Sequence, residues 1–95
     1  MRKIEKKCWV GWFEQILDGS KTYDLRLNDF EVEEGDVIIF KEWDPKTKSY
    51  TGREVEKKVG FVSQWKIDDL AKWWSREEIE DKGLQTISLK DNNVL

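Results

Sequence analysis

Four consecutive apolar residues, Val37-Ile38-Ile39-Phe40, stand in a chain of which 39% of the residues are charged. An unbroken apolar run of this length is typical of a strand that is covered on both faces. A turn-forming segment, residues 33–36, comes directly before the run. We therefore expect residues 37–40 to form a central strand, and the other elements must cover it.

The chain of 95 residues has room for one domain. The chain has six Trp, two Tyr and four Phe, and each of these large side chains can bury much apolar surface in a core. Most of these aromatic residues are needed for the stability of so small a domain before any can be assigned to a ligand. We predict a single domain over residues 1–95, and we expect a monomer.

Charge and the chemistry of the side chains exclude several classes of function. The net charge of −3 argues against a protein that coats duplex DNA by charge alone. One Cys and no His exclude a disulfide scaffold, a zinc knuckle, a Cys/His nucleophile pair and a His general base. We expect no metal and no cofactor.

The sequence also predicts a compartment. No apolar run approaches the roughly 18 residues of a transmembrane helix, and the first residues do not resemble a signal peptide. Cys8, next to Trp9, reads as a buried thiol that packs in the core. We expect a cytoplasmic protein with no membrane partner.

Hydrophobic periodicity predicts the elements of the first half. A short strand over residues 4–8 leads into a helix from Trp9 that ends at Gly19, where a positive φ reverses the chain. Residues 21–28 alternate between apolar and polar and predict a half-buried strand.

The second half starts with a long hairpin from residues 37–43 to residues 53–61. Residues 67–74 then show a helical pattern, and Ser75 with Glu78 forms a capping box that starts a new turn ending at Gly83. A last strand is expected over residues 84–89, and a frayed polar end over residues 90–93. The order predicts an α+β fold: a small, mixed, mostly antiparallel and barrel-like sheet with two or three helices.

One motif resembles a known family. The segment after the first helix is Gly19-Ser20-Lys21-Thr22-Tyr23-Asp24-Leu25-Arg26. It resembles the G-x-K-x-x-E-x-R signature of the ASCH domain, within the PUA-like superfamily, with Asp24 where that family usually has Glu. The stretches 26–30, 35–36, 42–45 (Glu42-Trp43-Asp44-Pro45) and 50–53 (Tyr50-Thr51-Gly52-Arg53) are similar to an ASCH-like branch. The resemblance covers residues 9–62 and implies a PUA-like β-barrel that binds RNA or a modified nucleoside.

The motif supplies three candidate ligand-binding residues, Lys21, Asp24 and Arg26. The ammonium of Lys21 is a mobile point charge, and the guanidinium of Arg26 makes a planar, two-point contact with phosphate. Asp24 would orient that guanidinium or act as an acid or base. Alternatively, Lys21 binds the last carbonyls of the first helix, and Arg26 only pairs with Asp24 or Glu42.

Aromatic and basic residues extend the candidate site. Trp12, Trp43 and Tyr50 are possible stacking platforms for a base. The hairpin is the most basic region and a possible rim for a nucleic-acid backbone, although a merely solvated hairpin explains the same charges. Its bases are Lys46, Lys48, Arg53, Lys57 and Lys58.

Three functions remain open. The leading hypothesis is a module that binds a nucleotide or single-stranded RNA in a charged cleft after the first helix. The second is a hydrolase for an acylated or modified nucleoside, with Lys21 and Asp24 in catalysis. Some ASCH relatives are amidohydrolases, but Asp24 stands where those enzymes have Thr. The third is an interaction protein, suggested by the acidic final third and the Trp73-Trp74 pair.

Overall fold

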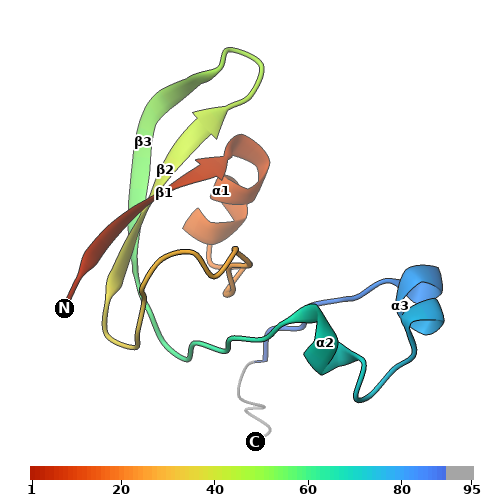
Figure 1. Ribbon diagram of the computed structural model, residues 1–95. Coiled ribbons are helices and arrows are strands. Elements are labelled where there is room, and N and C mark those ends of the chain that lie inside the picture. The colour runs from red at the N-terminus through yellow and green to blue at the C-terminus, as the bar shows by residue number, and fades with distance from the viewer. Residues whose placement is uncertain (90–95) are drawn as a thin grey trace, which may run out of the picture. The chain divides into compact units, whose positions relative to one another are not determined.

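Figure 1 shows the computed structural model of the protein, which describes residues 1–89. The chain divides into two compact units, Met1–Val62 and a second unit that begins at Ser63. The single-domain expectation stays a prediction. The elements are β1 (Lys3–Trp9), α1 (Val10–Leu17), β2 (Val37–Asp44), β3 (Ser49–Lys58), α2 (Ile67–Leu70) and α3 (Arg76–Lys82).

The first unit contains a three-stranded sheet in the order β1-β2-β3. The prediction that residues 37–40 belong to the central strand is confirmed. β1 pairs with β2 in parallel, from Lys3 opposite Val37 to Trp9 opposite Trp43, and β2 pairs with β3 in antiparallel fashion. The α+β class is therefore confirmed, with a mixed sheet that is not closed within residues 1–89.

The core of the first unit lies between α1 and one face of the sheet, which we call the inner face (Figure 1). Phe13 and Ile16 of α1 are 1% and 3% exposed and pack with Phe40 of β2 and Cys8 of β1. Ile38 and Val55 pack against this cluster. Cys8 is thus a core thiol, as expected.

The predicted first helix is confirmed, and it begins at Val10 immediately after β1. Its last residue is Leu17, and the predicted reversal of the chain follows at Gly19, whose φ of +84° lies in the region that favours glycine. The backbone N–H of Gly19 donates to the carbonyl of Ile16 at 3.3 Å, and that of Lys21 donates to the carbonyl of Gln15 at 3.0 Å. These bonds direct the next loop back toward the sheet.

Buried Asp36 joins the start of β1 to the start of β2. Its side chain accepts the backbone N–H of Arg2 at 2.8 Å, the backbone N–H of Glu33 at 3.0 Å and Nε of Arg2 at 3.2 Å. Its carbonyl accepts the N–H of Val59 at 2.7 Å, just beyond β3. One residue therefore ties together the same end of all three strands.

The second unit holds two short helices. Ser75 caps α3: its hydroxyl accepts the N–H of Glu78 at 3.1 Å, and the Glu78 carboxylate accepts the N–H of Ser75 at 3.1 Å. α3 ends at Gly83 with a φ of +70°. The predicted capping box and helix end are both confirmed.

Three predicted elements differ in the structure. Residues 21–28 and 84–89 are not strands, because no ladder of backbone hydrogen bonds pairs them with another described strand. The apolar residues of the first segment are exposed, with Leu25 at 68% and Leu27 at 80%. The helix expected over residues 67–74 is regular only to Leu70. The polar end at residues 90–93 lies outside the described residues.

Replacing Phe13 tests the core. Phe13→Ala removes a fully buried ring and should lower the free energy of unfolding by about 3–5 kcal/mol, measured by urea denaturation. Phe61→Ala is the matched control, because Phe61 is 92% exposed and should change stability by less than about 0.5 kcal/mol. Equal effects of the two substitutions would contradict this core.

Asp36 should make stability depend on pH in acid. The backbone N–H groups of Arg2 and Glu33 hold the pKa of Asp36 below its usual value. A lowered pKa in the folded state stabilises fully above the unfolded pKa of about 3.9, and this stabilisation is lost as the pH falls through the folded pKa. Asp36→Asn should lower the urea midpoint at pH 7, and the difference from wild type should shrink near pH 3. A constant difference would contradict the assignment.

Candidate binding site

Arg26 is the best-anchored residue of the loop that follows α1. Its Nη2 donates to the carbonyl of Lys7 in β1 at 2.9 Å, and its Nε donates to Oδ2 of Asp24 at 2.5 Å. The guanidinium also lies 5.9 Å from the centre of the Phe40 ring in β2. Two separate contacts therefore fix the guanidinium against the inner face of the sheet.

Both hypotheses from the sequence, ligand binding and a purely structural ion pair, include a contact between Arg26 and Asp24, and the structure has it. Asp24 Oδ2 is occupied by the Nε–H of Arg26, which suits a role in orienting the guanidinium. The side chains of both residues keep about a quarter of their surface exposed, at 22% for Asp24 and 26% for Arg26. The pair is thus accessible to a ligand from solvent.

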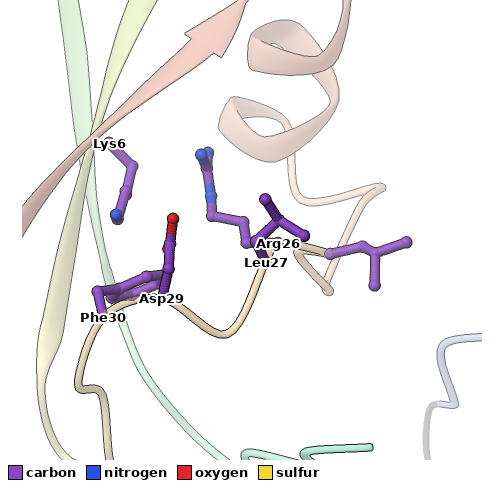
Figure 2. A pocket seen from close by; sticks show the side chains of 6 residues that line it. Lys6, Arg26, Leu27, Asp29 and Phe30 are labelled. Carbon is purple, nitrogen blue, oxygen red and sulfur yellow. The ribbon is translucent and has the colours of Figure 1, made fainter. Parts of the chain in front are cut away.

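A hollow of about 300 Å³ lies beside Arg26 (Figure 2). The charged ends of Lys6, Asp29 and Arg26 project toward the same space from β1 and from the loop (Figure 2). The remaining wall is apolar. The lining residues are Lys6, Leu25, Arg26, Leu27, Asp29 and Phe30.

Lys6 and Phe30 are functional candidates that the sequence reading missed. The ammonium of Lys6 lies 3.5 Å from the centre of the Phe30 ring, which holds both side chains at the hollow. The position of Lys6 in the sequence could have identified it. Lys6 falls between Ile4 and Cys8 in the alternation of β1 and therefore points to the inner face. A cation on the apolar face of a strand is unusual unless it has a partner or a ligand.

Lys21 lies over aromatic rings and does not line the hollow. Its ammonium is 4.8 Å from the ring of Trp12 and 5.3 Å from the ring of Tyr23. Trp12 is exposed and stacks on Trp9 with a centroid distance of 6.2 Å. Two of the predicted residues, Lys21 and Trp12, therefore lie together beside α1.

The three motif residues share an electrostatic influence on Cys8. Burial raises the pKa of the Cys8 thiol, and the nearby charge of Asp24 raises it further. The positive charges of Arg26 and Lys21 lower the same pKa. Because the net shift is upward, the thiol is a poor nucleophile, and it serves the core.

Arg53 binds two carboxylates. Its Nε and Nη2 donate to Oε1 and Oε2 of Glu42 at 2.9 and 2.8 Å, and Nη2 also donates to Glu14 of α1. Its guanidinium lies 5.0 Å from the ring of Phe13. Arg53 thereby joins α1 to β2 and β3, and it does not line the hollow.

An irregularity in β3 makes this contact possible. The register of β2 with β3 shifts between Lys41 and Trp43, and Gly52 there has a φ of +96°. The shift lets Thr51 and Arg53 both reach Glu42, whose Oε1 accepts the Thr51 hydroxyl at 2.6 Å. The hydrogen bonds from Arg53 and Thr51 lower the pKa of Glu42, which is 4% exposed.

Trp43 lies at the end of β2 and does not line the hollow. The ammonium of Lys7 is 3.8 Å from its ring centre, and the Tyr50 ring meets it edge-on at 4.9 Å. Of the six residues selected from the sequence, the structure thus brings Arg26 to the hollow, pairs Asp24 with Arg26, and places Lys21 beside Trp12. Trp43 and Arg53 lie elsewhere on the first unit, and their roles in binding stay predictions.

Residues 1–89 contain no group of three or more His, Cys, Asp or Glu side chains placed to hold a metal ion. None of the helices described there combines the length and the apolar character that crossing a membrane requires.

Comparison with known proteins assigns a family. A model of a domain of unknown function, DUF3850, matches residues 4–73, and the chain belongs to this family. It is similar to a protein of Escherichia phage P2 described as an uncharacterized 12.9 kDa protein in the GpA 3′ region, with 35% identity over 74 residues. That alignment covers 77% of this chain and 62% of the phage protein, so the chain spans less than two thirds of its relative. No solved structure matches the chain.

A double-mutant cycle tests the structural role of Arg53. Arg53→Met should lower the urea midpoint because it leaves the Glu42 carboxylate buried without its main partner. The variant that combines Arg53→Met with Glu42→Met should recover part of this loss, because no buried charge is then unpaired. Additive effects of the two single substitutions would show that the pair is not coupled.

Proposed function

We propose that this protein is a binding module for a nucleotide or single-stranded RNA, and that the hollow beside Arg26 receives an anionic group of the ligand. The observation that carries the proposal is the anchoring of Arg26 at the rim of the hollow. Two of its five N–H groups are used by Asp24 and Lys7. A guanidinium fixed in this way presents its other donors without a further loss of side-chain freedom.

The chemistry of the hollow supports a nucleotide-like ligand. Lys6 provides a second positive charge, and the carboxylate of Asp29 provides an acceptor for the N–H or O–H groups of a base or sugar. Leu25, Leu27 and Phe30 form the apolar wall. The volume of the hollow, about 300 Å³, is at the lower end of the range for small-molecule sites.

The proposal includes the family resemblance of the motif. We propose that the protein is an ASCH-type domain with a PUA-like barrel and that it acts as a cytoplasmic monomer. The arrangement of the motif supports this assignment: Gly19 ends the helix, and Asp24 and Arg26 then pair against the sheet. Barrel closure would require further pairing beyond the three described strands.

The pairing of Asp24 favours binding over the alternative of nucleoside hydrolysis. Its Oδ2 is engaged by Arg26, so that oxygen is not free to exchange a proton with a substrate. No observation within residues 1–89 favours the hydrolase, and the binding module is the function we propose.

Arg26→Gln tests the proposal. The substitution removes the charge and the two-point contact, and it should weaken binding of uridine monophosphate by about tenfold or more in calorimetric titrations. Arg26→Lys keeps the charge but lacks the planar guanidinium, and its affinity for uridine monophosphate should lie between those of wild type and Arg26→Gln.

Arg76→Gln is the matched control, because Arg76 is an exposed arginine in the second unit. It should leave the affinity unchanged. Circular dichroism must show that the Arg26 variants keep the fold, since Arg26 also contacts the Lys7 carbonyl. Equal affinities for wild type and folded Arg26→Gln would refute the role of the hollow.

A further inference from the structure

Four aromatic side chains lie at neighbouring positions at one end of the sheet, and we call this set the aromatic row: Trp12, Trp9, Trp43 and Tyr50. Trp12 and Trp9 stack with centroids 6.2 Å apart and planes 21° apart. Trp9 and Trp43 are register partners on the adjacent strands β1 and β2. Trp43 and Tyr50 are register partners on β2 and β3 and meet edge to face at 4.9 Å.

The aromatic row lies away from the core. Alternation along β1 and β2 places Trp9 and Trp43 on the face opposite Cys8 and Glu42, which belong to the inner face. Trp9, Trp12 and Tyr50 are 51%, 57% and 53% exposed. A group of exposed apolar side chains that belong to neighbouring elements is a candidate interaction surface.

Three of the four rings of the aromatic row have an ammonium group close to them. Lys21 lies 4.8 Å from the ring centre of Trp12, and Lys7 lies 3.8 Å from that of Trp43. Lys41 lies 5.9 Å from the ring centre of Tyr50 and also pairs with Glu5 at 3.5 Å. Three rings that can stack on a base therefore each have a cation beside them that can meet a phosphate.

We propose that the aromatic row is a binding track for single-stranded nucleic acid, with bases stacked on the rings and phosphates near Lys7, Lys21 and Lys41. This inference rests on the proposed function and deepens it, because it selects a strand over a free nucleotide. Stacking on aromatic rings is tolerant of sequence, since every base has a π face. The track therefore predicts binding with weak sequence preference.

The lysines favour nucleic acid over a protein partner. An apolar protein surface docked on the aromatic row would strip water from the ammonium groups of Lys7 and Lys21 without supplying counter-charges. A nucleic-acid strand supplies a phosphate with each nucleotide, and it releases bound counter-ions when lysines replace them. Duplexes are a poor fit, because their bases are stacked on one another and have no free face for the rings.

The experiment measures binding of a fluorescent oligouridylate of about twelve nucleotides, a length within the range that single-strand-binding folds cover. Trp12→Ala in the full chain should weaken binding by about 5- to 100-fold. Trp12→Phe keeps a ring and should recover most of the affinity. Trp73→Ala is the matched control, because Trp73 is 68% exposed and lies in the second unit; its affinity should equal that of wild type.

Salt dependence provides a second readout for the lysines. Lys21→Gln should reduce the slope of log affinity against log salt by roughly 0.7, the share of one phosphate contact on a single strand. An unchanged slope would remove Lys21 from the track. A duplex of the same length should bind much more weakly, and equal binding of the duplex would overturn the stacking model.

The outcomes separate the track from the hollow. If Arg26→Gln loses the mononucleotide but Trp12→Ala keeps full affinity for the oligonucleotide, the hollow stands and the track is overturned. If Trp12→Ala loses the oligonucleotide while Arg26→Gln has no effect on either ligand, the track stands and the hollow is refuted. Absence of oligonucleotide binding by wild type at low salt would overturn the track, even if the surface captured a protein.

Discussion

The parallel pairing of β1 with β2 is the constraint on which the rest of the first unit depends. Two parallel neighbours cannot be joined by a tight turn, so the chain must cross from the end of β1 back to the start of β2. That crossover consists of α1 and the loop up to Asp36. It supplies the helix that covers the core, and it also carries Arg26, Phe30 and Trp12. The connection that stabilises the sheet therefore also positions both candidate binding surfaces.

Charged residues divide into two groups with different tasks. Asp36 and Glu42 are buried acids whose partners, Arg2 and Arg53, tie strands or helix together. Arg26 and Lys6 instead have their charged ends at an open hollow. The two groups differ in burial. Removing a partner from a buried acid costs stability, whereas a partly exposed cation at a hollow is available to a ligand. Part of the sequence that resembles an ASCH-like branch accordingly has a structural explanation, namely Glu42, Thr51, Gly52 and Arg53.

The sequence predicted the elements that depend on local chemistry. Four features follow from periodicity and from the residues that favour helix ends: α1, the reversal at Gly19, the central strand and the capping box at Ser75. The segment 21–28 has the alternation of a strand but lacks a ladder partner, and alternation alone cannot supply one. The roles of Asp36 and Lys6 depend on which strands become neighbours. The parallel register that sets this was not readable from one sequence.

Nitrogen-15 NMR of the side chains tests the central claim most directly, because it observes the Arg26 guanidinium and each Trp indole in one titration. On addition of oligouridylate, we predict that the Nε–H signal of Arg26 and the indole signals of Trp9, Trp12 and Trp43 shift together, while those of Trp65, Trp73 and Trp74 stay in place. Shifts confined to the second group, or no shift at saturating oligonucleotide, would contradict the account.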